Sequence, residues 1–120
     1  MNKILVTGGA GFIGSNFILK LLKDDNIHIL NYDKLTYAGN LDNLIKIKDN
    51  NNYSFVHGDI KDVNSVTKVI NEFQPDSIVN FAAESHVDRS IDGPRDFIET
   101  NIVGTFVMLK SCFEYFKTLG

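Results

Sequence analysis

The chain has 120 residues, of which 43% are hydrophobic, 22% charged and 11% aromatic, and its formal charge at pH 7 is −3. A chain of this length forms one domain whose core needs no disulfide or structural metal. The 12 basic and 15 acidic residues include no basic block, which disfavours a nucleic-acid partner, and no apolar run is long enough to span a membrane. Cys112 is the only cysteine, which favours the reducing cytoplasm, and no Cys/His cluster has metal-ligand spacing.

Short apolar runs alternate with longer segments of helical periodicity in the first half of the chain, as in a parallel sheet with crossover helices. Strands are predicted at Ile4–Val6 and Ile27–Tyr32. The helix between them presents apolar residues at helical spacing, namely Phe12, Ile13, Phe17, Ile18, Leu21 and Leu22. A short amphipathic helix is then predicted at Leu41–Lys48, with an apolar stripe of Leu41, Leu44 and Ile45.

The same alternation continues in the second half. Strands are predicted at Tyr53–His57 and Ser77–Phe81. The helix between them is expected to begin at Asp62 as its N-cap and to end at Phe73, before Pro75, with inward-facing Val63, Val66, Val69 and Ile70. A loop at Ala82–Gly93 leads to a long helix at Pro94–Lys117, in which proline suits the first helical position.

The predicted fold class is α/β, a Rossmann-type doubly wound parallel sheet with strand order 3-2-1-4. Right-handed crossovers place the first two helices on one face and the last two on the other. The domain is expected to occupy residues 1–120 and to stop before a fifth strand. In such sheets ligands bind outside the carboxyl ends of the strands where the strand order reverses, here between the first and fourth strands.

A glycine cluster follows the first strand and satisfies both Gly9-x-Gly11-x-x-Gly14 and Gly8-x-x-Gly11-x-x-Gly14. The early glycines permit a tight turn, Gly11 lets backbone N–H groups approach a pyrophosphate at the helix N-terminus, and Gly14 allows close packing of helix and strand. Because the cluster links a strand to a helix and is followed by an acidic residue, it predicts a dinucleotide site rather than a glycine-rich turn without a ligand.

That acidic residue is Asp33, nineteen positions after Gly14 and at the end of the second strand. Its carboxylate would accept hydrogen bonds from the adenosine ribose hydroxyls and would repel a 2′-phosphate. The sequence therefore favours NAD over NADP, although the neighbouring Lys34 is an argument in the other direction.

Two further segments end strands at the same edge. Asp59 and Ile60 follow the third strand, where they either flank the adenine or form a turn into the next helix. Small residues follow the fourth strand in Phe81-Ala82-Ala83-Glu84-Ser85, which fits either a chain passing close to a dinucleotide or tight packing.

These residues occur within longer blocks that resemble the amino-terminal part of the dTDP-glucose 4,6-dehydratase family, a branch of the extended short-chain dehydrogenases/reductases. The resemblance covers the whole chain. The most particular blocks are Asp33-Lys34-Leu35-Thr36-Tyr37-Ala38-Gly39-Asn40-Leu41 and Asn80-Phe81-Ala82-Ala83-Glu84-Ser85-His86-Val87-Asp88-Arg89-Ser90-Ile91.

The resemblance implies a tightly held NAD⁺ and a nucleotide-sugar substrate, dTDP-glucose, which Ser85 also approaches. It assigns cofactor contacts to the glycine motif (Gly8, Gly11 and Gly14) and to Phe12, Ile13, Asp33, Lys34, Leu35, Thr36, Asp59, Ile60, Phe81, Ala82, Ala83, Glu84, Ser85 and Thr100. It also implies a reaction in which hydride leaves C4 of the glucose, water is lost across C5 and C6, and the hydride returns to C6. The product, dTDP-4-keto-6-deoxyglucose, lies on the way to rhamnose and related sugars.

The chain departs from the family pattern in its catalytic residues. No Tyr-x-x-x-Lys pair occurs, because the residues four positions after Tyr32, Tyr37, Tyr53 and Tyr115 are Thr36, Leu41, His57 and Leu119. The Asp-Glu pair of the family also lies beyond Gly120, so no catalytic residue is assigned here. Three hypotheses follow: the cofactor-binding part of a dehydratase, a dinucleotide-binding module without catalysis, or part of a related 4-epimerase or UDP-sugar dehydratase.

The last predicted helix carries a wide apolar surface. Without strands 5 and 6, part of this surface is expected to face water and to promote association. In the family this helix contributes to a dimer interface, so the resemblance implies a homodimer. The residues concerned are Phe97, Ile98, Ile102, Val103, Phe106, Val107, Leu109, Phe113 and Phe116.

Overall fold

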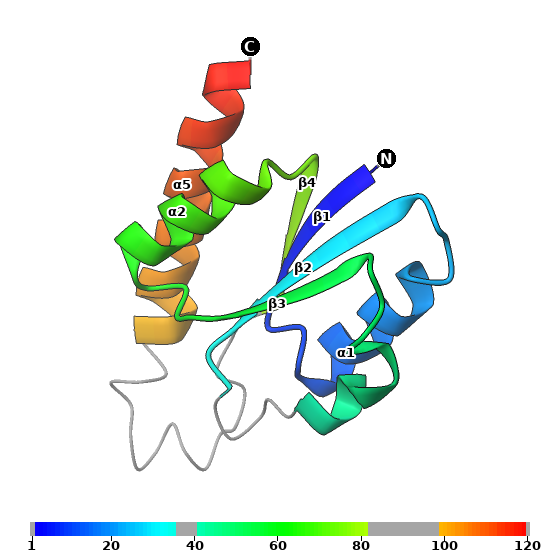
Figure 1. The fold of residues 1–120 in the computed structure, drawn as a ribbon. Coiled ribbons are helices and arrows are strands. Elements are labelled where there is room, and N and C mark those ends of the chain that lie inside the picture. Colours follow the sequence, from blue (N-terminus) through cyan, green and yellow to red (C-terminus); the bar gives the residue numbers. More distant parts are fainter. Residues whose placement is uncertain (1, 36–40, 82–98, 120) are drawn as a thin grey trace, which may run out of the picture.

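The computed structural model describes residues 2–35, 41–81 and 99–119, with the backbone alone described at 41–43 and 99–101. Within these ranges four strands alternate with helices (Figure 1). The strands are β1 (Asn2–Thr7), β2 (Ile27–Asp33), β3 (Tyr53–His57) and β4 (Ser77–Asn80). The helices are α1 (Phe12–Leu21), the 3₁₀ helix η1 (Leu41–Ile47), α2 (Val63–Phe73), the π-helix η2 (Glu99–Gly104) and α5 (Thr105–Leu119).

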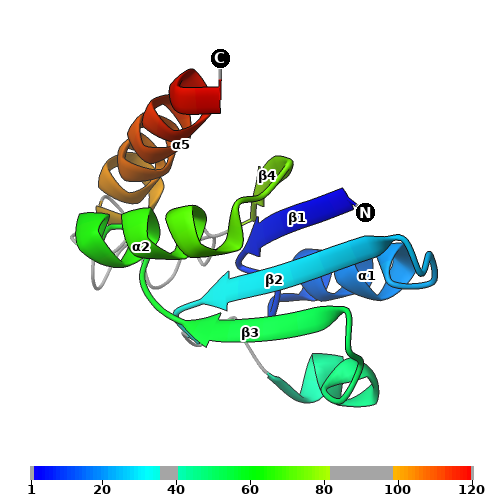
Figure 2. The ribbon, with the colours of Figure 1, turned by 45° about the horizontal axis from the view of Figure 1, so that its top comes forward.

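The strands form one parallel sheet in the order β3-β2-β1-β4, which confirms the predicted topology (Figure 2). β1 pairs with β2 on one side, with Val6 opposite Asn31, and with β4 on the other, with Thr7 opposite Asn80. The chain thus leaves β1 toward β2 and later returns to pair β4 with the opposite edge of β1. This reversal of strand order places the carboxyl ends of β1 and β4 side by side at the predicted ligand crevice.

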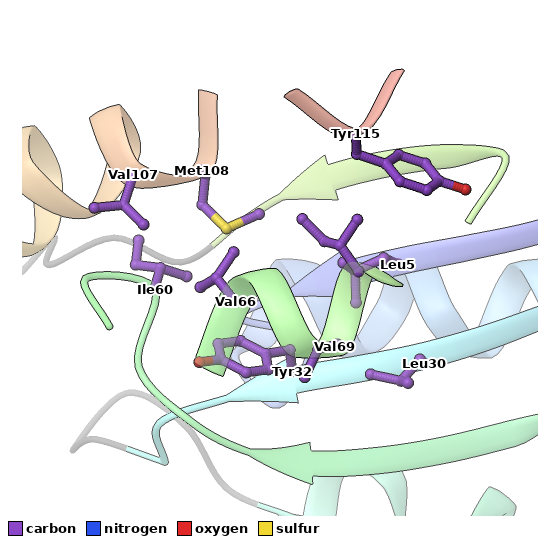
Figure 3. Close-up of a cluster of buried hydrophobic side chains, with 10 residues drawn as sticks. Leu5, Leu30, Tyr32, Ile60, Val66, Val69, Val107, Met108 and Tyr115 are labelled. Atoms are coloured by element: carbon purple, nitrogen blue, oxygen red, sulfur yellow. The ribbon is translucent and has the colours of Figure 1, made fainter. Parts of the chain in front are cut away.

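Helices cover both faces of the sheet, so alternate residues of each central strand enter different cores. Leu5 joins a cluster beneath α2 and α5 that contains Tyr32, Val66 and Met108 (Figure 3). Its neighbours Ile4 and Val6 join a second cluster beneath α1 and η1, on the opposite face. The predicted distribution of helices over the two faces is therefore confirmed.

Helix α2 begins as the sequence predicts but buries a narrower face. The Asp62 side chain caps the helix by accepting a hydrogen bond from the backbone N–H of Ser65 at 3.2 Å. Val66, Val69 and Ile70 are buried, whereas Val63 is 52% exposed. The inward prediction for Val63 was wrong because this residue is the first of the helix and lies outside the apolar cluster that the following turns join.

The second predicted helix forms as a 3₁₀ helix, which changes the residues that face the core. With three residues per turn, positions 44 and 47 align on one side. Leu44 is buried and Ile47 packs against the same cluster, whereas Ile45 is 57% exposed. The predicted place of Ile45 in the apolar stripe was wrong because it assumed the α-helical period.

The long predicted helix is divided in the described part of the chain. Glu99–Gly104 is π-helical and only Thr105–Leu119 is α-helical, with Gly104, a weak helix former, at the junction. Residues 94–98 lie outside the described residues. Cys112 is half-buried against the cluster under α5, as expected of a small core residue, and burial raises the pKa of its thiol.

The outer side of α5 carries large apolar side chains that no described residue covers. We call this surface the α5 apolar face; it consists of Phe106, Leu109, Phe113 and Phe116 of α5 with Ile102 and Val103 of η2, and all six are exposed. This confirms, for these six residues, that part of the apolar helix surface faces water. Among the described residues, no helix combines the length and hydropathy that a membrane span requires.

Candidate functional site

The glycine cluster forms the turn between β1 and α1 at the carboxyl edge of the sheet. Gly8 has a φ of 71°, in the left-handed region that favours glycine, and its N–H donates to the carbonyl of Tyr32 at 3.0 Å. Next to it, the Thr7 hydroxyl donates to the Asn80 side-chain oxygen, which ties the ends of β1 and β4 together. The turn therefore begins at the reversal of strand order.

Two side chains of β2 hold the next residues of the turn. The Gly9 N–H donates to Asn31 Oδ1 at 3.0 Å, and the Ala10 N–H donates to Asp33 Oδ2 at 2.8 Å. Both bonds are buried. The loop is thus attached to β2 at successive residues, which fixes its course before the helix begins.

The N-terminus of α1 is open. Gly11, the N-cap, has extended backbone dihedrals and provides no side-chain cap, and the first turn contains no acidic residue. The Phe12 and Ile13 N–H groups make no hydrogen bond within the described part of the chain, and the Phe12 side chain is 80% exposed. Unpaired N–H groups and the positive end of the helix dipole favour an anion at this position.

Two glycines are required by close packing. A Cβ on Gly14 would collide with Gly8 O and would lie 2.8 Å from Gly9 Cα, so α1 approaches the backbone of the turn directly. A Cβ on Gly9 would collide with Asn31 Oδ1 and with Ile18 Cδ1. The sequence predicted that Gly14 allows close packing of helix and strand; the geometry shows instead that it allows close packing of α1 against the turn after β1.

The Asp33 carboxylate lies beside the turn and is only 7% exposed. One oxygen accepts from Ala10, and the other accepts from the Leu35 N–H at 2.7 Å. Leu35 has a φ of 59°, uncommon for a non-glycine residue, and the Asp33 carboxylate supports this turn. Because a carboxylate has about four lone-pair positions, it keeps capacity to accept from ligand hydroxyls.

The end of β3 brings Asp59 to the same edge. Asp59 Oδ2 lies 3.3 Å from Lys34 Nζ and 3.9 Å from Lys61 Nζ, so one carboxylate faces two ammonium groups. The Gly58 N–H donates to the Asp33 carbonyl at 3.0 Å, which holds the segment beside β2. The Ile60 side chain packs in the core under α2 and α5, which leaves only its backbone at the edge.

Sequence reasoning missed two residues that organise the site, Asn31 and Tyr32. The Tyr32 hydroxyl lies 2.8 Å from the Asp59 carbonyl and 2.9 Å from Ser65 Oγ, and the ring lies where a Cβ on Gly58 would be. Burial raises the pKa of the Tyr32 hydroxyl above its ordinary value. The available signal was a polar residue, Asn31, directly after the apolar pair Ile29 and Leu30 in a predicted strand.

The remaining predicted contacts are only partly described. The Phe81 N–H donates to the Thr7 carbonyl at 2.8 Å, and the Phe81 ring packs edge-to-face on Phe17 of α1 at 5.2 Å between centroids. Its side chain therefore belongs to the core. Thr36 and Ala82, Ala83, Glu84 and Ser85 lie outside the described residues, as does the side chain of Thr100. Within the described ranges, no three His, Cys, Asp or Glu side chains gather as metal ligands.

Comparisons with known proteins place this site in a family context. A curated dTDP-glucose 4,6-dehydratase from Salmonella typhimurium is 52% identical over 118 residues, which is 98% of this chain and 33% of the relative. The chain therefore spans about a third of the length of the curated relatives it matches.

Two solved structures show the same fold. A dTDP-glucose 4,6-dehydratase from Bacillus anthracis, in complex with NAD, has a TM-score of 0.85 and 45% identity and covers 96% of this chain and 34% of its own. A UDP-glucose 4-epimerase from Thermotoga maritima has a TM-score of 0.83 and 33% identity, covering 94% of this chain and 34% of its own. The model of the GDP-mannose 4,6-dehydratase family matches residues 5–118, nearly the whole chain, so the chain belongs to this family.

Proposed function

We propose that this chain is the NAD⁺-binding part of a dTDP-glucose 4,6-dehydratase. The observation that carries the proposal is the attachment of the glycine turn to Asp33, through the 2.8 Å bond from Ala10, beside an open helix N-terminus. An anion site and a hydroxyl acceptor lie together there, as a pyrophosphate joined to a ribose requires. The relative from Bacillus anthracis, in complex with NAD, supports the choice of cofactor.

The described residues suggest a division of roles along the cofactor. The Phe12 and Ile13 N–H groups would bind the pyrophosphate, Asp33 would accept from the adenosine ribose, and Asp59 with the Ile60 backbone would flank the adenine. Lys34, Leu35, Thr36, Thr100 and the segment Phe81–Ser85 complete the proposed contacts, and Ser85 would also approach the sugar nucleotide. When bound, NAD⁺ supplies a hydride acceptor that the side chains of the protein lack.

The charges at the ribose position favour NAD⁺ over NADP⁺. Asp33 would repel a 2′-phosphate, and Lys34, which could attract one, lies 3.3 Å from the Asp59 carboxylate. Because Lys34 is paired, its charge is partly neutralised within the site. This arrangement weakens the argument for NADP that the sequence left open.

The dehydration itself is proposed for the full-length protein. The chain has no Tyr-x-x-x-Lys pair to act as base, so residues 1–120 are proposed as a cofactor domain without catalysis of its own. Greater identity to the dehydratase (45%) than to the epimerase (33%) favours dehydration over 4-epimerisation. A role in rhamnose biosynthesis and a cytoplasmic location belong to the same proposal.

The activity is tested on the full-length protein with dTDP-glucose and, separately, UDP-glucose, with the products identified by mass. We expect the product from dTDP-glucose to be lighter by one water, because the proposed reaction is a dehydration. Calorimetry on the same protein should show that NAD⁺ binds. A product of unchanged mass would instead identify an epimerase. NAD⁺ binding without turnover of either sugar nucleotide would leave only the binding module.

A homodimer formed through the α5 apolar face is also proposed. Contiguous exposed apolar surface of this kind marks association sites in soluble proteins. We expect Phe113→Glu to convert a dimer of the full-length protein to a monomer, because the new carboxylate would be desolvated in the interface. Light scattering coupled to size exclusion measures the change.

Asn71→Glu is the matched control, since it adds the same charge at an exposed position of α2. It should leave the dimer intact. A Phe113→Glu variant that remains dimeric would remove the α5 apolar face from the interface.

A further inference from the structure

Asn31 is a fully buried polar residue of β2 that lies on one strand face between the apolar Ile29 and the carboxylate of Asp33. Its relative exposure is 0%, and Ile29, which precedes it on the same face of β2, belongs to the apolar cluster under α1. Burying an amide in such surroundings is unfavourable unless its polar atoms are hydrogen-bonded. A branched aliphatic residue would be the expected occupant, so the amide needs a structural reason.

Both ends of the amide are bonded, and to different elements. Oδ1 accepts from the Gly9 N–H at 3.0 Å, and Nδ2 donates to the Tyr53 hydroxyl at 3.2 Å. Tyr53 opens β3 and is half-buried, and its hydroxyl gives Nδ2 a partner. Because the Gly9 N–H can only donate, the amide presents its oxygen to the glycine turn.

The contact with Gly9 completes a series of three bonds from β2 to the turn. The successive N–H groups of Gly8, Gly9 and Ala10 donate to the Tyr32 carbonyl, to Asn31 and to Asp33. None of these three is left to face a phosphate. The Phe12 and Ile13 N–H groups, which lack a partner within the described part of the chain, therefore carry the anion-binding role.

We propose that Asn31 is a positioning residue for pyrophosphate binding. By holding Gly9 against β2, it fixes the turn so that the first N–H groups of α1 point toward the phosphates, and the Tyr53 hydroxyl bonds the other end of its amide. The inference rests on the proposed NAD⁺ site. It assigns to Asn31 an effect on phosphate binding alone, in contrast to Asp33, whose carboxylate would also contact the ribose.

The experiment compares three ligands that share adenosine but differ in phosphates: NAD⁺, ADP and adenosine. Their Kd values are measured by calorimetry or NMR titration on the full-length protein. For Asn31→Leu, we expect the Kd values of NAD⁺ and ADP to rise together by about tenfold or more, because the loop loses one of its three attachments. The Kd of adenosine should change by less than about twofold, since the ribose acceptor remains.

Two further variants separate positioning from a general loss of stability. Ile29→Val trims the core on the same face of the same strand without removing a hydrogen bond, and it should leave all three Kd values unchanged. Tyr53→Phe removes only the acceptor for the Asn31 amide and should weaken NAD⁺ and ADP by about threefold, with adenosine unaffected.

The outcomes decide between the proposals. Equal weakening of NAD⁺ and adenosine in Asn31→Leu, or no weakening of either, overturns the positioning role. If Asn31→Leu does not fold, Tyr53→Phe provides the test. A Tyr53→Phe variant with an unchanged ratio of NAD⁺ affinity to adenosine affinity overturns the positioning role of Asn31. Failure of the unsubstituted protein to bind NAD⁺ would instead contradict the proposed cofactor site.

Discussion

Replacing Asp33 by alanine is expected to raise the Kd for NAD⁺ by about 100-fold and to lower the free energy of unfolding by about 2–5 kcal/mol. The carboxylate accepts from Ala10 and Leu35, and Ala10 is fully buried, so the Ala10 N–H would be left without its acceptor from Asp33. Cofactor binding would lose the proposed ribose contact and the fixed course of the turn at once. Calorimetric titration with NAD⁺ and urea unfolding measure the two effects.

Asp76→Ala is the matched control for this prediction. Asp76 Oδ2 accepts from the Lys3 N–H at 2.8 Å, so this variant also removes a carboxylate–backbone bond, but near the opposite end of β1 and in an exposed position. We expect a smaller loss of stability and an unchanged Kd for NAD⁺. An Asp33→Ala variant that binds NAD⁺ within about threefold of the unsubstituted protein would contradict the ribose assignment.

The second large effect is expected for Gly14→Ala. The new methyl would collide with Gly8 O and would lie too close to Gly9 Cα, and backbone atoms cannot rotate away as a side chain can. We expect the free energy of unfolding to fall by about 1–3 kcal/mol, although alanine is otherwise the better helix former by about 1 kcal/mol. Relief of the clash must move α1 away from the turn, so the Kd for NAD⁺ should rise by about tenfold or more.

Asn16→Ala tests the same helix without a collision. Asn16 is exposed on α1 and its side chain donates locally, to the Phe12 carbonyl at 2.8 Å. Alanine at this position should leave NAD⁺ affinity unchanged and alter stability little. A Gly14→Ala variant that is as stable as Asn16→Ala and has an unchanged Kd for NAD⁺ would contradict the requirement for close packing at Gly14.

Much of the fold follows from local patterns in the sequence. The run Ile4-Leu5-Val6 is apolar at every position because β1 is covered on both faces, and this pattern predicts a central parallel strand. The expectations for Ile45 and Val63 were wrong because periodicity shows only that a segment is amphipathic. The kind of helix, and how far it contacts the sheet, decide which of its apolar residues are buried.

The sequence by itself determined the strands and their order, because apolar runs that alternate with amphipathic segments are local signals. Glycine spacing and an acidic residue at the end of β2 are also local signals, and they predict the cofactor site at this edge of the sheet. Only the tertiary structure decided how the site is held together. Asn31 meets Gly9 because the register of β2 against β1 places it beside the turn, and Tyr32 meets Asp59 across the next strand. Such bonds join residues more than twenty positions apart, so no local pattern specifies them; they depend on the strands pairing in this register.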